Sequence, residues 1–238
     1  MKSLETIKEV KQLNKDTYLL RIKSKIISGS AKPGQFVNVK CCAGLNAYLR
    51  RPISICEVNR EEETYDIVYQ VRGQGTQILC EMEQGESLDV MGPLGNGFSL
   101  NPDDDTLIVV GGGIGTFPLI QLLKEHPAKK KTAILGFRSK EAMVLTDRFE
   151  KYSHEVLIAT DDGSFGHKGF VTEILEKELI KGSAKKVFIC GPTPMMARSA
   201  ALCKSHGVSS EVSMEQRMGC GVGACLVCAC KTHEGEDW

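Results

Sequence analysis

Three cysteines near the end of the chain have a spacing that suits an iron–sulfur cluster. Cys220, Cys225 and Cys228 follow the pattern C-x4-C-x2-C, the plant-type arrangement for three of the four thiolates of a [2Fe-2S] cluster. Such a cluster only moves electrons. Cys230 follows the third thiolate by two residues, where the chain has little room to wrap. We therefore expect the fourth ligand beyond Trp238, unless Cys230 or a water takes its place.

The residues between these cysteines fit a loop around a compact anionic group. Gly219, Gly221 and Gly223 permit positive φ angles and let backbone N–H groups point at sulfur. Zinc is the alternative occupant, but structural zinc favours two C-x2-C pairs and this loop has one. A disulfide framework is disfavoured because the 238 residues include ten cysteines, need no cross-links and begin with no signal peptide. This cysteine usage predicts a reducing, cytoplasmic compartment.

The overall composition describes a globular protein without a charge preference. The 238 residues leave room for two domains, 42% of them are hydrophobic, and the formal net charge is zero. Nucleic-acid binding would require a basic excess, and the only cationic run, Lys129 to Lys131, fits a solvated loop. No apolar stretch reaches the length of a membrane span. We expect a soluble protein with neither nucleic-acid nor membrane contacts.

The first hundred residues have the pattern of a small antiparallel β-barrel, with short β-branched or aromatic runs between turns. The expected strands are Thr17–Ile22, Gln35–Val39, Ile53–Val58 and Tyr65–Val71. After them, Gly73-Gln-Gly-Thr76 opens a short expected helix, Thr76–Met82, which Thr76 would cap. Glycines before a helix start leave N–H groups free for a phosphate, so this turn is a candidate phosphate site.

From Asp105 onward, strand patterns alternate with helix patterns, which predicts a parallel sheet covered on both faces. The expected strands are Thr106–Val110, Thr132–Phe137, Glu155–Thr160, Lys186–Cys190 and Ser210–Ser213. The expected helices are Pro118–Lys124, Lys140–Phe149, Phe170–Glu178 and Pro194–Ser205. The polar segment before Asp105 marks a boundary, so we expect domains at residues 1–100 and 105–214, followed by the cysteine segment at 215–238.

A run of glycines follows the first strand of this second half. Gly111-Gly-Gly-Ile-Gly115 stands between a strand and a helix, where a backbone can approach a dinucleotide phosphate closely. Thr116 takes the place of the last glycine of the standard fingerprint, and a plain tight turn is the alternative interpretation. Arg138 stands where an acidic residue usually contacts the ribose, and an arginine there can accept a 2′-phosphate. NAD and NADP therefore both remain open.

Three further stretches carry residues that could contact a cofactor. Arg50-Arg-Pro-Ile-Ser54 puts a guanidinium and a hydroxyl at a strand start, within reach of a phosphate and a flavin ring. Cys190-Gly-Pro192 follows a buried strand, at the edge where parallel sheets bind ligands, and Asp161-Asp-Gly-Ser164 also follows a strand. The alternatives are a surface charge for Arg51, a small core residue for Cys190 and a solvated loop for the third stretch.

Taken in order, these motifs resemble those of the ferredoxin-reductase-like flavoproteins. The resemblance covers nearly the whole chain and is closest to the electron-transfer subunits of bacterial dihydroorotate dehydrogenases of the B type, because ordinary members of the superfamily lack the cysteine loop. It implies an N-terminal antiparallel barrel that binds FAD, a parallel-sheet domain that binds NAD, and a C-terminal [2Fe-2S] segment.

The resemblance also implies which residues hold each cofactor. Those for FAD are Arg51, Pro52, Ile53, Ser54, Val68, Tyr69, Gln70, Gly75 and Thr76. Those for the nicotinamide dinucleotide are Gly111, Gly112, Gly113, Gly115, Cys190, Gly191 and Pro192. The cluster ligands are Cys220, Cys225 and Cys228, and in the family the fourth lies further along the chain, about where this sequence ends.

An electron route and a partner follow from the same resemblance. A catalytic subunit with FMN oxidises dihydroorotate to orotate in de novo pyrimidine (UMP) biosynthesis, and electrons pass through the cluster and FAD to NAD+. FAD stands between the two because a hydride carries two electrons, the cluster carries one, and a flavin handles both. The chain shows no catalytic site for the pyrimidine, so we expect it to need its partner, in a heterotetramer.

Two alternatives use the same residues differently. A related FAD and [2Fe-2S] subunit could serve a sulfide dehydrogenase, a transhydrogenase or a hydrogenase, with the same cofactors and another partner. A more distant alternative is a non-enzymatic interaction module whose cysteine loop binds zinc. The partner and the metal content distinguish these alternatives, whereas the direction of electron flow and the oligomeric state do not follow from the residues.

Overall fold

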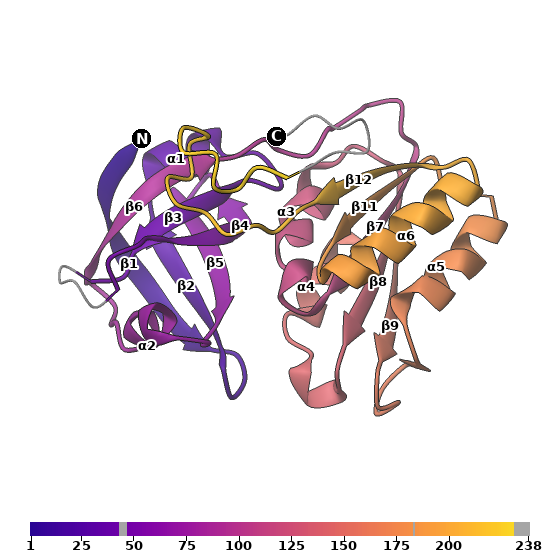
Figure 1. The fold of residues 1–238 in the computed structure, drawn as a ribbon, viewed down its shortest axis with the longest axis horizontal. Helices are drawn as coiled ribbons and strands as arrows, with labels where there is room; N and C mark the ends of the chain where they lie inside the picture. Colours follow the sequence, from indigo (N-terminus) through magenta and orange to yellow (C-terminus); the bar gives the residue numbers. More distant parts are fainter. Residues whose placement is uncertain (43–46, 183, 231–238) are drawn as a thin grey trace. The chain divides into compact units, whose positions relative to one another are not determined.

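The computed structural model describes residues 1–42, 47–182 and 184–230, which form two compact units (Figure 1). The barrel unit contains the residues up to Gly97 and those from Glu215 on, and the sheet unit contains Phe98 to Met214. The cysteine loop therefore belongs to the same unit as the barrel, although the whole sheet unit separates the two in sequence.

The barrel unit is a closed antiparallel barrel with strand order β1-β2-β5-β4-β3-β6. Its elements are β1 (Lys2–Gln12), β2 (Thr17–Lys23), α1 (Lys25–Ser30), β3 (Phe36–Lys40), β4 (Arg51–Asn59), β5 (Thr64–Gln70), α2 (Gln74–Cys80) and β6 (Ser87–Leu94). Alternate residues of these strands point inward and form one apolar core, which includes Ile22, Val37, Ile55 and Ile67. All four predicted strands are present, and the predicted barrel is confirmed.

Two strands and one helix of the barrel unit were not predicted. β1 has the sequence KSLETIKEVKQ, in which Glu5 and Ile7 are buried and the residues around them are partly or fully exposed. Its many charged residues hide this alternation in the sequence. Glu5 is a charged residue that is buried, because its carboxylate accepts hydrogen bonds from Ser24 Oγ at 2.5 Å and Tyr65 Oη at 2.9 Å. Composition alone cannot reveal such a strand, since its partners come from elsewhere in the chain.

The helix that opens after Gly73 begins two residues earlier than expected. Gly73 is the N-cap of α2, and Thr76 lies at the third helical position, so the predicted cap at Thr76 is wrong. The Thr76 hydroxyl accepts hydrogen bonds from the backbone N–H of Gly73 at 3.2 Å and of Arg72 at 2.9 Å. Thr76 is therefore not the N-cap, but its hydroxyl holds the turn that precedes α2 and so stabilises the start of the helix.

The sheet unit is a six-stranded, all-parallel sheet with strand order β10-β9-β8-β7-β11-β12. Its elements are β7 (Thr106–Gly112), α3 (Pro118–Glu125), β8 (Lys130–Phe137), α4 (Thr146–Tyr152), β9 (Glu155–Thr160), β10 (His167–Lys168), α5 (Val171–Ile180), β11 (Lys186–Cys190), α6 (Thr193–Ser205) and β12 (Ser209–Ser213). Within this unit, α5 and α6 cover one face of the sheet and α3 and α4 the other (Figure 1). The predicted parallel sheet is confirmed.

One predicted helix of this unit, Lys140–Phe149, is wrong in its first half. A 3-10 turn covers Lys140–Ala142, and α4 begins only at Thr146. Leu145 separates them with φ of 58°, a left-handed conformation that interrupts a helix. Among the described residues, no helix is long and apolar enough to cross a membrane.

Candidate cofactor sites

The glycine loop and the Cys190 turn meet at the carboxyl edge of the parallel sheet. β7 and β11 are neighbours, and their register places Gly111 beside Cys190. A Cβ atom at Gly115 would lie 2.6 Å from Gly191 Cα and 2.8 Å from the carbonyl carbon of Cys190. Real Cβ atoms do not approach a backbone so closely, so only glycine fits there. The structure thus brings together two motifs that lie about eighty residues apart in the sequence.

Met195 is a residue of this edge that the sequence did not point to. A Cβ at Gly112 would lie 2.6 Å from Met195 Sδ and 2.9 Å from Pro192 Cδ, and one at Gly191 would lie 2.8 Å from Met195 Cε. The thioether therefore packs into the space left by two glycines. A methionine in an amphipathic helix usually belongs to a core, so only its contacts with both turns reveal its position.

Gly113 differs from its neighbours. It has φ of 56°, and a Cβ placed there would meet no atom within 4 Å. The Thr116 hydroxyl donates to the Gly113 carbonyl at 2.8 Å, which closes the 3-10 turn Gly113–Thr116 in front of α3. The open side of Gly113 leaves backbone accessible at the end of β7, as the approach of a phosphate requires.

In the barrel unit, Arg51 lies against the start of α2. A Cβ atom at Gly75 would lie 2.7 Å from Arg51 Nε and 3.0 Å from Arg51 Nη2. The guanidinium thus stands beside the first turn of a helix, where backbone N–H groups also favour negative charge. The two motifs predicted to hold a flavin phosphate converge, and their donors fit the pyrophosphate of a dinucleotide such as FAD.

The neighbouring arginine has a different role. Arg50 Nη1 donates to the backbone carbonyls of Asn38 at 3.1 Å and Asp89 at 3.0 Å, and its Nη2 pairs with Asp89 Oδ1 at 2.8 Å. Arg50 therefore ties β3 to β6 and supports the barrel. Of the two adjacent guanidinium groups, the one of Arg51 is in position to bind a ligand.

The predicted flavin residues on β4 and β5 do not all share one face. Ile53 and Tyr69 belong to the barrel core, whereas Pro52, Ser54 and Val68 are on the opposite faces of their strands. Burial raises the pKa of Tyr69, and its hydroxyl has no hydrogen-bond partner among the described residues. Pro52 and Ser54 can therefore contact a ligand outside the barrel, and Ile53 acts by packing.

Gln70 is tied to the residues around it. Its side-chain oxygen accepts from Arg72 Nε at 2.8 Å, and its amide nitrogen donates to Asp16. These contacts hold Gln70 at the end of β5, just before the turn into α2.

The cysteine loop turns as its glycines predict, and its backbone points at sulfur. Gly221 and Gly223 have φ of 73° and 78°, and Gly219 instead packs against Cys225 Sγ. The backbone N–H of Val222 donates to Cys220 Sγ and that of Cys220 donates to Cys225 Sγ, both at 3.4 Å. Such donors stabilise thiolates.

The loop has the donor chemistry of a cluster site. Hydrogen bonds from the backbone of Val222 and from Cys225 lower the pKa of Cys220 to about 6, so its thiolate is favoured at neutral pH. In the described part of the chain, however, no three side chains of the metal-ligating types are gathered around one point. The loop thus fits a [2Fe-2S] cluster in residue type and backbone orientation, and its ligand side chains are not drawn together by protein contacts alone.

Other polar stretches of the sheet unit are explained by local contacts. Ser164 Oγ donates to Asp162 Oδ1 at 2.6 Å and accepts from the Lys140 backbone at 2.7 Å, so the Asp161–Ser164 turn holds the loop after β8. Arg138 lies in that loop, exposed at the carboxyl end of β8. These contacts account for the polar residues of the turn, in line with the solvated loop that the sequence left open.

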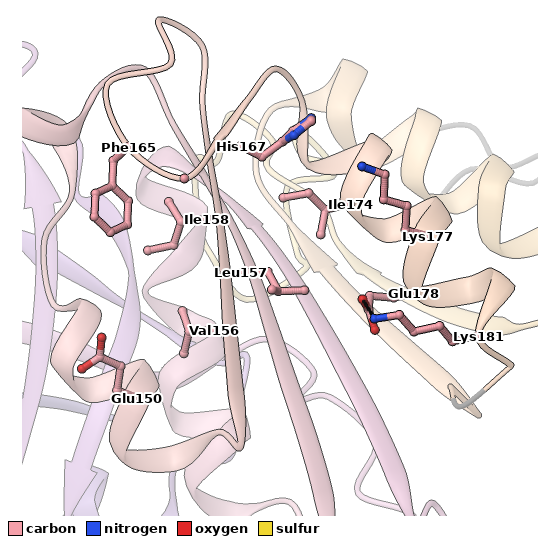
Figure 2. A pocket seen from close by; sticks show the side chains of 11 residues that line it. Glu150, Val156, Leu157, Ile158, Phe165, His167, Ile174, Lys177, Glu178 and Lys181 are labelled. Atoms are coloured by element: carbon pink, nitrogen blue, oxygen red, sulfur yellow. Dashed lines mark hydrogen bonds and ion pairs between the residues drawn. The ribbon is translucent and has the colours of Figure 1, made fainter.

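A depression of about 510 Å³ lies on the same unit, along β9, the strand next to the edge strand β10 (Figure 2). It is lined by Val156 and Ile158 of β9, by Phe165 and His167, and by Lys177 of α5, among other residues. None of the predicted cofactor residues lines it. It is thus separate from the carboxyl edge of the sheet that the glycine loop occupies.

Comparison with known proteins agrees with this arrangement. The model of the iron–sulfur cluster binding domain of dihydroorotate dehydrogenase B matches residues 215–237, and that of the oxidoreductase NAD-binding domain matches residues 109–201. In solved structures, the fold is similar to that of an NADH-dependent reduced ferredoxin-NADP oxidoreductase, with a TM-score of 0.83 and 29% identity over 95% of this chain and 82% of the other. A ferredoxin NADP+ reductase from Neisseria gonorrhoeae with bound FAD and NADP has the same fold, with a TM-score of 0.74 and 18% identity over 90% of this chain and 99% of the other.

Relatives with curated names extend over almost all of the chain. The dihydroorotate dehydrogenase B (NAD(+)) electron transfer subunit of Fusobacterium nucleatum is 40% identical over 98% of this chain and 91% of its own length. The subunit of the same name from Geobacillus kaustophilus is 38% identical over 97% of this chain and 90% of its own. With its barrel, sheet and cysteine loop in the same order, the chain belongs to the family of dihydroorotate dehydrogenase B (NAD(+)) electron transfer subunits.

Proposed function

We propose that this chain carries electrons between a dihydroorotate-oxidising subunit that contains FMN and the NAD+ of the cell. FAD accepts single electrons from a [2Fe-2S] cluster and passes them on as the electron pair of a hydride. The observation that carries the proposal is the convergence of the Arg51 guanidinium with the start of α2 at Gly75, in the unit that also holds the cysteine loop.

Arg51, Gly75 and Thr76 bind the FAD pyrophosphate in this proposal. The guanidinium neutralises phosphate charge, Gly75 leaves room for it, and Thr76 orders the turn that exposes the helix N–H groups. Ser54, together with Pro52, Val68 and Gln70, borders the isoalloxazine ring. Ile53 and Tyr69 hold these strands from inside the barrel.

The carboxyl edge of the sheet binds the nicotinamide dinucleotide. Gly113 exposes backbone to the phosphates, while Gly111, Gly112 and Gly115 allow the glycine loop to pack closely against the Cys190–Pro192 turn. Cys190, which is 3% exposed, fixes the end of β11, so that Gly191 and Pro192 border the nicotinamide. We assign NAD rather than NADP by family membership, with Arg138 in reach of the ribose side.

Cys220, Cys225 and Cys228 bind the cluster, and the surface around them suits a protein partner. Val222, Leu226 and Val227 are 58%, 71% and 60% exposed, so this loop presents apolar side chains next to its thiolates. Exposed apolar side chains that adjoin a functional site commonly mark an interface. We place the FMN-containing subunit here, in a heterotetramer. We place the protein in the cytoplasm because a chain of 238 residues with ten cysteines and no need of cross-links fits a reducing compartment.

Reconstitution with the catalytic subunit tests this function. The two subunits, co-purified without oxygen, should reduce NAD+ when dihydroorotate is added, whereas this chain alone should only oxidise NADH with an artificial acceptor. A chain that binds FAD and iron but gives no NAD+ reduction with that subunit belongs instead to another partner, such as a sulfide dehydrogenase or hydrogenase.

A further inference from the structure

Asn38 is a buried polar residue that none of the assignments above uses. It lies in the middle of β3 and is 1% exposed, and its side-chain Oδ1 has no hydrogen-bond partner among the described residues. Buried amide oxygens are nearly always paired, because leaving one unpaired costs the free energy of its hydration. The side chain is therefore a candidate for a contact that forms when a site is loaded.

The cysteine loop lies directly over this side chain. A Cβ atom at Gly221 would lie 2.9 Å from Asn38 Nδ2 and 3.6 Å from Asn38 Cγ. Val37 and Val39 point into the barrel core, so the carboxamide between them points outward, beneath the loop. Gly221 directly follows the first cluster thiolate, Cys220. Asn38 thus reaches the backbone segment that positions that thiolate.

The strand predicted to bind the flavin runs along the same face of the barrel. β3 pairs with β4 in antiparallel register, with Asn38 opposite Pro52 and Phe36 opposite Ser54. Ser54 and Asn38 are therefore diagonal neighbours on the outer face, and the side chains of such neighbours stand about 7–8 Å apart. The carboxamide lies between the flavin strand and the cysteine loop within one compact unit.

We propose that Asn38 is a positioning residue for the iron–sulfur cluster. The carboxamide atom nearest Gly221 is Nδ2, so in the loaded protein the carboxamide turns over about its Cβ–Cγ bond. Its Oδ1 then accepts a hydrogen bond from a backbone N–H of the loop around Gly221, which fixes the cluster at a set distance from the flavin strand. The inference rests on the proposed function, which puts the cluster on this loop and FAD on β4. Because a carboxamide is neutral, it holds the loop without adding charge beside an anionic cluster.

Two substitutions separate the anchoring of the loop by Oδ1 from the effect of charge on the cluster. Asn38→Leu keeps the approximate volume but removes the acceptor, so the loop should hold its cluster less firmly. Asn38→Asp keeps an acceptor oxygen and adds a negative charge, so the loop should stay anchored while the cluster becomes harder to reduce. Thr64→Val is the matched control, because Thr64 Oγ1 on β5 is another buried oxygen of the barrel that has no hydrogen-bond partner among the described residues.

The experiment uses the anaerobically purified holoprotein and follows cluster absorbance during incubation with an iron chelator. Asn38→Leu should lose its cluster about tenfold faster than the unchanged protein, the lower end of the effect of removing a partner of a metal ligand. Asn38→Asp should lose it at the unchanged rate but show a lower cluster midpoint potential in a titration followed by electron paramagnetic resonance. Thr64→Val should change neither quantity, and FAD content should be equal in all four proteins.

An Asn38→Leu protein that keeps its cluster as long as the unchanged protein would overturn the role of Asn38. If that variant fails to fold, an unchanged cluster potential in Asn38→Asp would overturn it instead. Unchanged protein that binds FAD but no iron would refute the proposed cluster site itself, and the inference with it.

Discussion

The glycine loop of the sheet unit and the cysteine loop of the barrel unit are both rich in glycine, for different physical reasons. At the sheet edge, a Cβ atom at Gly112 or Gly115 would lie less than 3 Å from neighbouring atoms, so only glycine leaves them enough space. In the cysteine loop, Gly221 and Gly223 supply positive φ angles, and a Cβ at Gly223 would meet no atom within 4 Å. Packing therefore shapes most of the first loop, where only Gly113 has a positive φ and open space, and backbone conformation shapes most of the second, where Gly221 also lies close to Asn38.

This difference indicates how each site becomes ready for its ligand. The sheet edge is held by two parallel strands and by Met195, so its shape exists before a nucleotide arrives. The cysteine loop has mostly exposed side chains and no strand of its own in the described chain, so the proposed function implies that its ligands come together through the metal. The predictions below test this contrast between a prebuilt and a metal-built site.

The largest effect is expected at the cysteine loop. Cys225→Ser should abolish the iron–sulfur signal and electron transfer from the partner subunit, because the loop has little besides its thiolates to hold a cluster. FAD content and bleaching of FAD by NADH should be unchanged. Iron analysis and visible spectra check both points. An unaltered iron content in Cys225→Ser would mean that the cluster lies elsewhere.

At the sheet edge, Gly115→Ala should damage the NAD site and the sheet unit. Its new Cβ meets backbone atoms of Cys190 and Gly191, which cannot move independently, so a loss of about 3 kcal/mol in stability is expected. In Gly113→Ala, the new Cβ meets no atom within 4 Å, so the loss of stability should come only from the strain of a positive φ, about 1–2 kcal/mol. Urea unfolding measures both, and equal losses would show that close packing does not shape this loop.

In the barrel, Arg51→Ala should weaken FAD binding by roughly 10- to 100-fold. The reason is the loss of a hydrogen bond to a charged phosphate, which is worth about 1.5–3 kcal/mol. Arg60→Ala removes the same charge just beyond the far end of β4 and should leave FAD binding intact. Equilibrium titration of the flavin-free protein with FAD gives both constants. Unchanged affinity in Arg51→Ala would refute the assignment of this strand to the flavin phosphates.

A smaller effect is expected for the Arg50–Asp89 ion pair, which ties β3 to β6. Burial acts to raise the pKa of Asp89, but hydrogen bonds and charge from Arg50 and Lys2 outweigh it and lower that pKa. Asp89→Asn should therefore cost about 1 kcal/mol of stability at pH 7. Because the folded pKa is lowered, the difference should persist above the unfolded value of about 3.9 and vanish as pH falls through the folded pKa. Urea unfolding across this range measures it, and a difference independent of pH would exclude the ion pair as its cause.

Much of the fold could be predicted because its strands have local signals. β9 and β11 match their predicted bounds, since buried parallel strands are continuous apolar runs with turns on either side. β1 could not be predicted, because its buried Glu5 is stabilised by hydrogen bonds from Ser24 and Tyr65, which only the closed barrel brings near. The break at Leu145 likewise has no composition signal, since leucine rarely adopts positive φ.

The candidate sites could be predicted as motifs but not as contacts. The pattern of glycines indicated a close approach, yet only the register of β7 with β11 reveals that Gly115 approaches Gly191. Arg50 and Arg51 are indistinguishable in sequence, and their different partners separate a supporting residue from a binding one. Asn38 gave no sequence signal at all, because a single asparagine in a strand is informative only once its burial is known.

The most direct test of the electron-transfer account is an anaerobic visible spectrum of the purified protein before and after NADH, with iron and zinc analysis of the same sample. The account predicts flavin bands that NADH bleaches, together with a reddish iron–sulfur absorption and iron in the protein. A colourless protein that contains stoichiometric zinc would contradict it, since the cysteine loop would then serve structure rather than electron transfer.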